Sequence, residues 1–497
     1  MPNEPRHESP EKNVKSILEW LALAHGRAGL EDATRLHRKL LLLRATPLPM
    51  EQRLQLLDLL YGYAARLATA QFPALHETTL PVSRKMRQLV RSIQDSLEVL
   101  AQDYVDTLTA APESATRRPA ASLRPAMQCL AWHVTISHLA AAPTAPGIWQ
   151  QLHGVFRTAR RLGAEDEPGP AGESTIHRIY LSSLLLSVVQ PASFTSRELE
   201  FIGNYIDHCA PTIQLAEEIP AEHEGIFWID PDRDAPAHAL ARRTPPPETP
   251  VLYFACDVIA QGAADHLAAL ESGRSAADLG LPAFAESHAG RGVLRRLASF
   301  WGRPAKRKFP RRRQSYRADL CAGLAPLWQL LNSPDEAPGA VSEWMITNES
   351  PDGYAMMHVS GTPGELRVGD IVALRPHRGD AAGERAWQIC IVRWALSENP
   401  EHIELGLQVL AGQGIPAILA LPRNHQAGTA ALLLPKAPPL RPSQALVVPT
   451  GTVDDPSEKL IVVVEQDNVA VYELRPTCLD ERTASVEVFT VEPDERP

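Results

Sequence analysis

Residues 343–359 read EWMITNESPDGYAMMHV. Residues 343–347 and 354–359 have the composition of short strands, and the polar turn Asn348-Glu-Ser-Pro-Asp-Gly353 lies between them. Similar strand patterns occur at Asp319–Leu324, Ile371–Leu374, Trp387–Trp394 and Ile403–Leu410. Many short strands separated by turn residues are typical of a small antiparallel β-barrel, and we expect one here.

An arginine motif lies upstream of this turn. Arg313-Gln-Ser-Tyr-Arg317 has the form RxxxR, and Arg312 precedes it. A guanidinium group pairs bidentately with phosphate, stacks on a base and matches the O6/N7 edge of guanine. Asn348 and Ser350 add short polar groups, and we expect Gly353 to adopt a positive φ that other residues resist. The arginines and the turn together suit a ligand that has guanine edges and phosphates.

The two motifs, in this order and followed by a barrel pattern, resemble the PilZ domain, the bacterial receptor module for cyclic di-GMP. The resemblance covers roughly residues 308–412 and includes the strand approach LRVGDIVAL at residues 366–374. It implies that the chain binds cyclic di-GMP. The residues to which it assigns this binding are Arg312, Arg313, Arg317, Asn348, Ser350 and Gly353. The stretch between the motifs is longer than the family pattern, and we expect an insertion or a short helix there.

The whole sequence predicts a multidomain α+β protein, because 497 residues exceed what one hydrophobic core serves. Apolar residues three or four apart from Met86 to Tyr104 are typical of an amphipathic helix. We expect a helical N-terminal region at 1–225, a mixed connecting region at 226–300 that ends in a basic linker, a PilZ-like antiparallel β-barrel at 301–420, and a small C-terminal all-β module at 425–497. The last module could be a small sandwich or a second barrel.

A strongly basic run joins the connecting region to the barrel. From Arg291 to Arg317 there are eleven Lys or Arg residues and no Asp or Glu. Such a run is usually solvated and flexible. Because RxxxR lies at its end, we expect cyclic di-GMP to order this segment and to change how the helical and β regions pack.

Composition excludes several classes of protein. A net charge of −10 argues against a dedicated nucleic-acid-binding protein. The six cysteines have no CxxC spacing, which favours a reducing compartment over a disulfide framework or a zinc site. The polar N-terminus and the short apolar stretch Ile179–Val189 predict a cytoplasmic protein without membrane insertion. The absence of a P-loop, a nucleophile elbow and a dinucleotide fingerprint predicts no enzyme, no cofactor and no metal.

The leading hypothesis is therefore a non-enzymatic cyclic di-GMP receptor, whose helical region binds an unidentified protein effector. One alternative is a ligand-free scaffold of PilZ shape, with the arginines in a solvated linker. A nucleic-acid adaptor that uses the basic run is a weaker alternative, because the total charge is negative and few aromatic residues are interleaved with the arginines.

Overall fold

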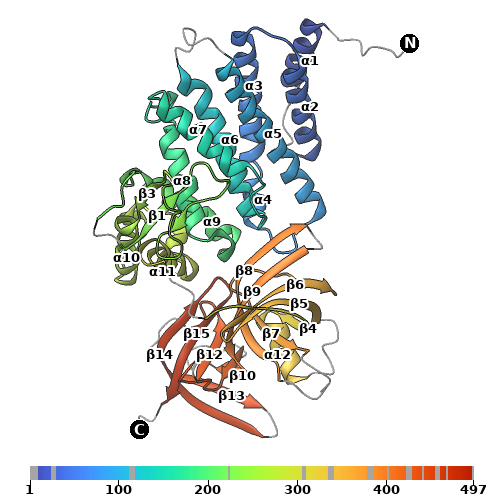
Figure 1. Cartoon of the computed structure of the whole chain (residues 1–497). Coiled ribbons are helices and arrows are strands. Elements are labelled where there is room, and N and C mark those ends of the chain that lie inside the picture. Colours follow the sequence, from blue (N-terminus) through green and yellow to red (C-terminus); the bar gives the residue numbers. More distant parts are fainter. Residues whose placement is uncertain are drawn as a thin grey trace.

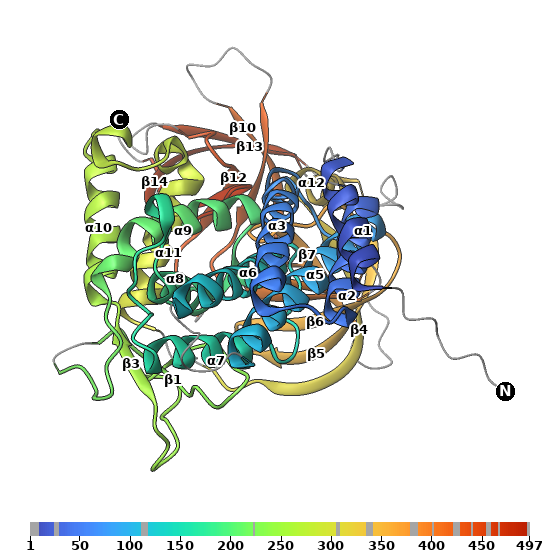
Figure 2. The same cartoon turned by 90° about the horizontal axis from the view of Figure 1, so that it is seen from above.

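The computed structural model describes residues 9–23, 29–110, 118–221, 224–304, 309–333, 341–377, 386–399, 402–420, 428–438, 441–453, 459–465 and 468–494. Three layers are stacked in Figure 1: a helical region, a small mixed α/β region beside its lower end, and two β-barrels below. Seen from above, the helices lie over the barrels (Figure 2). In the described part of the chain, no helix has both the length and the apolar character needed to cross a membrane.

The N-terminal region is helical, as the sequence predicts. Its helices are α1 (Pro10–Leu23), α2 (Leu30–Ala45), α3 (Met50–Thr69), α4 (Phe72–His76), α5 (Arg84–Thr109), α6 (Pro119–Leu139), α7 (Ile148–Arg161), α8 (Ile176–Val188) and α9 (Ser196–Cys209). The apolar stripe of α5 is buried against its neighbours, from Leu89 to Tyr104. At the start of α9, the Thr195 backbone N–H donates to the Glu198 carboxylate, and the Glu198 backbone N–H donates to the Thr195 hydroxyl, which is a capping box.

A small mixed region follows the helices. It contains β1 (Ile226–Ile229), β2 (His238–Ala239), β3 (Leu252–Ala255), α10 (Asp257–Glu271) and α11 (His288–Gly302), and the sheet order is β2-β1-β3. One hydrophobic core joins the helical and mixed regions and includes residues from Ile17 in α1 to Trp301 in α11. The expectation of a flexible basic linker is wrong for residues 291–302, because the apolar residues between the arginines form one face of α11 and are buried. Residues 305–308 of the basic run lie outside the described residues.

The first barrel is closed and antiparallel, as expected. Its elements are β4 (Arg312–Ala322), α12 (Leu324–Asn332), β5 (Val341–Ser350), β6 (Gly353–Ser360), β7 (Ile371–Pro376), β8 (Gln388–Asn399) and β9 (His402–Ala411), and the strand order is β4-β5-β6-β9-β8-β7. The short helix expected between the two motifs is α12. Alternate residues such as Trp344, Ile346, Met356 and Leu405 fill the interior, so the residues between them face outward.

The C-terminal module is a second closed barrel. Its strands are β10 (Ile415–Ala420), β11 (Thr429–Leu434), β12 (Ala445–Pro449), β13 (Leu460–Glu465), β14 (Val469–Arg482) and β15 (Val486–Pro493), in the order β10-β11-β12-β15-β14-β13. The predicted bounds of the first barrel, 301–420, include Ile415–Ala420. The structure instead pairs this strand with β11 and β13.

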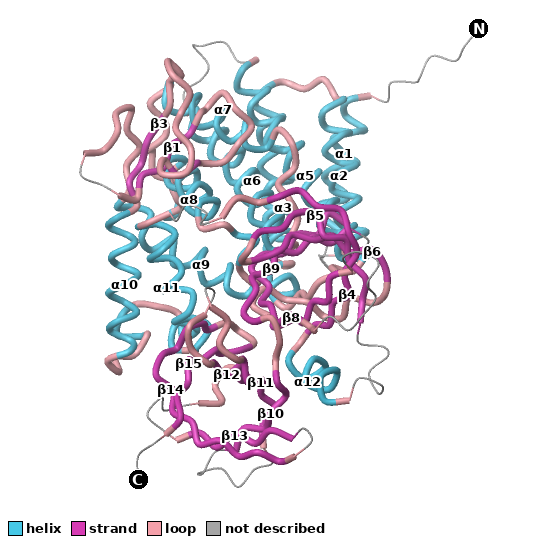
Figure 3. The backbone as a smooth tube through the Cα atoms, turned by 60° about the horizontal axis from the view of Figure 1, so that its bottom comes forward, coloured by secondary structure: helices cyan, strands magenta, loops and turns pink. Residues whose placement is uncertain are grey.

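The three layers are held together by specific contacts. Residues on the outer faces of both barrels form a shared core with α12, which touches both (Figure 3). The Leu80 and Leu366 backbones exchange hydrogen bonds of 3.0 and 3.1 Å between the helical region and the first barrel. A second contact joins the same two regions: Arg87 of α5 donates to the carbonyl of the fully buried Ser397 on β8, at 2.6 Å. Strand β8 is thus fastened to the helical region.

Candidate functional site

The arginine motif belongs to a strand. The sequence predicts a first strand at Asp319–Leu324, with the arginines in the basic run before it, but β4 already begins at Arg312. The polar residues are held there by backbone pairing, since Arg313 lies opposite Asn348 and Arg317 lies opposite Met345 on β5. Strand pairing can override composition when a neighbouring strand offers an edge. RxxxR is therefore built into the barrel wall.

A row of side chains crosses the outer wall of the barrel. The strand register places Arg313 of β4 opposite Asn348 of β5, Asn348 opposite Ala355 of β6, Ala355 opposite Gly406 of β9, and Gly406 opposite Trp394 of β8. Residues that lie directly opposite each other across paired strands share one face of the sheet. This row, which we call the wall row, therefore has an arginine and an asparagine at one end, two small residues in the middle and a tryptophan at the other end.

The tryptophan of the wall row lies flat against the neighbouring strand. A Cβ added to Gly406 would be only 1.8 Å from the Trp394 indole nitrogen. The indole therefore occupies the space that any other residue at position 406 would fill. A hollow of about 280 Å³ adjoins it and is lined by Trp394, Gln408, Ser350, Arg311 and Arg393, among others. We call this space the wall hollow.

The turn of the second motif is a tight hairpin loop between β5 and β6. Ser350 pairs with Gly353 across it, and the Ser350 hydroxyl donates to the Asp352 carboxylate at 2.7 Å. The expectation of a positive φ at Gly353 is wrong. Glycine is needed for a different reason: a Cβ at this position would lie 2.1 Å from the carbonyl oxygen of Leu407 on β9.

Arg317 lies on the outer face of β4, beyond the wall row. Its guanidinium donates to Glu343 at 3.0 Å. Two residues further on, burial favours the protonated form of Asp319, but hydrogen bonds from His377 and Arg375 outweigh burial and hold the pKa of this carboxyl below its ordinary value. This part of the wall thus carries compensated charges of both signs.

Arg312 faces away from the wall row. It lies opposite Glu349 and lines a separate hollow of about 640 Å³ with Tyr316 and His377. The Tyr316 hydroxyl donates to Glu349 at 2.9 Å. The structure therefore places Arg313 opposite Asn348, and Ser350 opposite Gly353 at the end of the adjoining hairpin. Arg317 is further along the strand, and Arg312 lines the separate hollow, which Ser350 also lines.

Sequence reasoning missed the far side of the wall hollow. Arg393, Trp394 and Gln408 were assigned to later strands of the barrel and given no role. A glycine inside a strand, such as Gly406, often marks a close approach of another group, and this signal could have identified its partner Trp394. The pairing of the two strands, however, cannot be read from the sequence.

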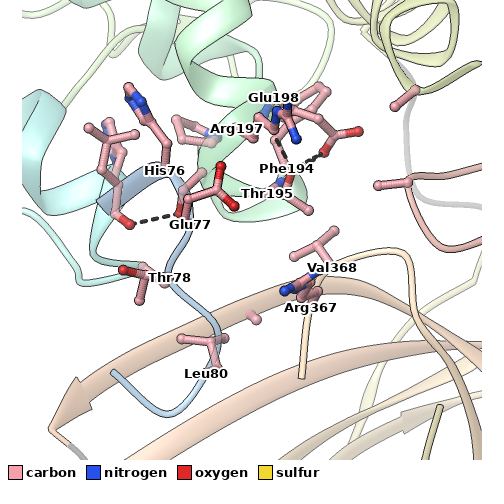
Figure 4. Close-up of a pocket in the computed structure, with 18 of the residues that line it drawn as sticks. His76, Glu77, Thr78, Leu80, Phe194, Thr195, Arg197, Glu198, Arg367 and Val368 are labelled. Atoms are coloured by element: carbon pink, nitrogen blue, oxygen red, sulfur yellow. Dashed lines mark hydrogen bonds between the residues drawn. The ribbon is translucent and has the colours of Figure 1, made fainter. Parts of the chain in front are cut away.

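A further cavity lies where the three layers meet. It has a volume of about 430 Å³ and lies between the start of α9 and the loop before β7 (Figure 4). Arg197 and Glu77 from the helical region and Arg367 from the barrel line it, together with apolar side chains such as Phe194 and Val368. Its charges are mixed, and of the PilZ-like motifs only LRVGD reaches it. The cavity thus marks the joint between the helical region and the barrels.

Comparison with known proteins identifies the first barrel. The model of the family described as "Cyclic-di-GMP receptor FimW, middle PilZ domain" matches residues 331–416. The chain is a PilZ-domain protein. The model described as "Cyclic-di-GMP receptor FimW, N-terminal domain" matches residues 15–221 of the helical region. One relative of this PilZ-domain protein, the cyclic-di-GMP receptor FimW of Pseudomonas aeruginosa, is 24% identical to it over 519 aligned residues, which cover 85% of this chain and 81% of the relative.

The matched part of the PilZ domain includes only one of the two motifs. Residues 331–416 contain Asn348, Ser350 and Gly353 together with Trp394 and Gly406. Strand β4, which carries RxxxR, lies upstream of the matched residues. The assignment of the arginines to a ligand therefore rests on their place in the wall and remains a prediction.

Proposed function

We propose that this protein is a non-enzymatic receptor for cyclic di-GMP and that the ligand binds on the outer wall of the PilZ barrel. The wall row carries this proposal, because it sets Arg313 and Asn348 on one side of a floor of small residues and Trp394 on the other. The name of the Pseudomonas aeruginosa relative supports the choice of ligand.

The chemistry of the wall row fits a cyclic dinucleotide with two guanines and two phosphates. The Trp394 indole offers a flat surface on which a guanine stacks. At the other end, Arg313 presents a planar fork to phosphate or to the O6/N7 edge of guanine, and Asn348 adds a donor and an acceptor. Neighbouring strands are about 4.8 Å apart, so the four steps of the row span about 19 Å along the wall.

Arg317 would bind the ligand by giving up its ion pair with Glu343. Its ion pair with Glu343 is partly exposed, with 43% and 37% of the two side chains accessible. Exposed pairs of this kind contribute little stability, so a phosphate competes with Glu343 at small cost. Arg312, on the opposite face, would contribute only if the ligand extends around the end of β4, which makes it the weakest of the proposed ligand residues.

The proposed route of signalling changes with the structure. Because α11 and β4 are folded, the proposed signal is not the ordering of a long basic linker. It is a small movement of the barrel against the helical region. Strand β8 supports this route, since it carries Trp394 and is fastened through Ser397 to Arg87 of α5. We propose that the helical region passes this change to a protein effector. All six cysteines are free, which supports action in the reducing cytoplasm.

Calorimetric titration of the full chain with cyclic di-GMP tests the proposal, with GTP and single-stranded RNA as competitors. We expect saturable binding that neither competitor displaces, and its loss in the Arg313→Ala/Arg317→Ala double variant. Arg295→Ala is the control, because it removes one arginine from α11, where Arg295 pairs with Glu271. Absence of binding would favour the ligand-free scaffold, and displacement by RNA would favour the nucleic-acid adaptor.

A further inference from the structure

One arginine of the wall hollow is held by both barrels. Arg393 lies next to Trp394, at an irregular point of the pairing between β8 and β9. Its Nε donates to the side-chain oxygen of Gln408 at 2.6 Å, and its Nη2 donates to the carboxylate of Glu481 at 2.6 Å. Gln408 belongs to the PilZ barrel, whereas Glu481 lies on β14 of the second barrel.

These two bonds fix the plane of the guanidinium. An arginine has five N–H donors in a rigid fork, so two acceptors on different atoms leave the group little freedom to rotate. Among the described residues, no acceptor bonds Nη1 of Arg393, and its two donors are available to a ligand in the wall hollow. A donor that is already oriented loses less conformational entropy when it binds a phosphate or a base.

The position of Glu481 is set by the fold of the second barrel. A bulge in the pairing of β14 with β15 lies between Leu479 and Glu481. A bulge changes the direction in which the adjacent side chains point. The side chains of Arg393 and Glu481 are 34% and 21% exposed, so their ion pair is better shielded from water than a typical surface pair.

We propose that the second barrel completes the ligand site of the PilZ barrel, with Glu481 as a positioning residue that orients Arg393 toward a phosphate or guanine edge of the ligand. This inference rests on the proposed function. It gives the C-terminal barrel a role in binding, although none of the residues described for that barrel lines the wall hollow.

Substitutions at Glu481 separate orientation from charge. Glu481→Gln keeps an acceptor at the same reach and removes the negative charge. Glu481→Asp keeps the charge and withdraws the acceptor by one methylene group, and Glu481→Ala removes both. If Glu481 acts by orienting Arg393, the affinity for the ligand depends on whether the side chain at position 481 is long enough to place an acceptor at Arg393. If it instead competed with the anionic ligand for Arg393, both Glu481→Gln and Glu481→Ala would bind more tightly.

The experiment is calorimetric titration of the full chain with cyclic di-GMP. We expect Glu481→Ala and Glu481→Asp to raise Kd about fivefold to tenfold, and Glu481→Gln to stay within about twofold of the unsubstituted chain. In an Arg393→Ala background, Glu481→Ala should have no further effect. Glu473→Ala is the matched control, because Glu473 lies on the same strand and pairs with Lys459, the residue before β13.

Several results would overturn the inference. Glu481→Ala with unchanged or tighter binding would exclude a positioning role, and so would an equal loss in the presence and absence of Arg393. If Glu481→Ala does not fold, as judged by thermal unfolding, the Glu481→Asp and Glu481→Gln pair decides, and equal affinities for these two would also exclude the role. Absence of binding by the unsubstituted chain would overturn the proposed function itself, which is a distinguishable outcome.

Discussion

Replacement of Gly406 by alanine should abolish the stacking surface without removing any polar group. The added Cβ would lie 1.8, 2.2 and 2.4 Å from three atoms of the Trp394 indole ring. Carbon atoms pack at about 3.5–4.0 Å, so the ring must move by about 1.5–2 Å or rotate away from the strand. The half-buried indole can rotate, whereas the backbone of β9 is held in the barrel between β6 and β8.

Two magnitudes follow from this displacement. Stacking of a base on an aromatic side chain contributes about 1–3 kcal/mol, so loss of the platform should raise the Kd for cyclic di-GMP about 5- to 150-fold. Overpacking of this kind costs about 1–3 kcal/mol of folding free energy, so the barrel should remain folded with a lower Tm. Trp394→Ala should weaken binding to a similar extent, because both substitutions remove the same surface.

Calorimetry measures the affinity, and circular dichroism measures the Tm of each variant. Gly412→Ala is the matched control, because a Cβ at Gly412 meets no atom within 4 Å. It should leave both the affinity and the Tm unchanged. Wild-type affinity in a Gly406→Ala variant whose Tm is clearly lowered would refute the reasoning, since the indole would then have moved without consequence for the ligand.

Three further outcomes are expected. Arg313→Ala and Arg317→Ala should each weaken cyclic di-GMP binding by about 1.5–3 kcal/mol in calorimetry, and lysine should not restore it, because the planar fork is lost. Titrations at low and high ionic strength should show weaker binding with added salt, and a flat response would contradict arginine–phosphate pairing. Burial lowers the pKa of His133 from its ordinary value of 6.5 to about 4. As pH falls, His133 is protonated in the unfolded chain at a higher pH than in the folded chain. Urea unfolding should therefore show the free energy of unfolding falling by about 3 kcal/mol between pH 6.5 and 4, and by less in His133→Gln.

Much of the fold could be predicted from local patterns. The stripe from Leu89 to Tyr104 is buried as one face of α5 and Met86 is half-buried before it, because a 3.6-residue period produces the same face whatever the neighbours are. The capping box at Thr195 formed for a similar reason, since its bonds join residues three apart. Alternation and turns likewise predicted two β modules, although periodicity alone did not distinguish a sandwich from a second barrel.

Predictions failed where distant parts of the chain supply the partners. Arginine-rich residues 291–302 had the composition of a linker, but packing against the mixed region buries the apolar face of α11. Ile415–Ala420 joined the second barrel because strand composition does not specify a pairing partner. Gly353 is required by the carbonyl of Leu407, more than fifty residues away in the sequence, rather than by its own turn.

In the candidate site, too, some features could be predicted from the sequence and others depend on distant parts of the chain. The sequence by itself predicted which side chains bind the ligand, because RxxxR and NxSxxG have the donors that guanine and phosphate require. Only the tertiary structure decided that Arg313 and Asn348 share a wall with Trp394, that Arg312 faces away, and that Glu481 holds Arg393. The physical reason is that closing a barrel fixes the register of all its strands together, and register decides which side chains become neighbours.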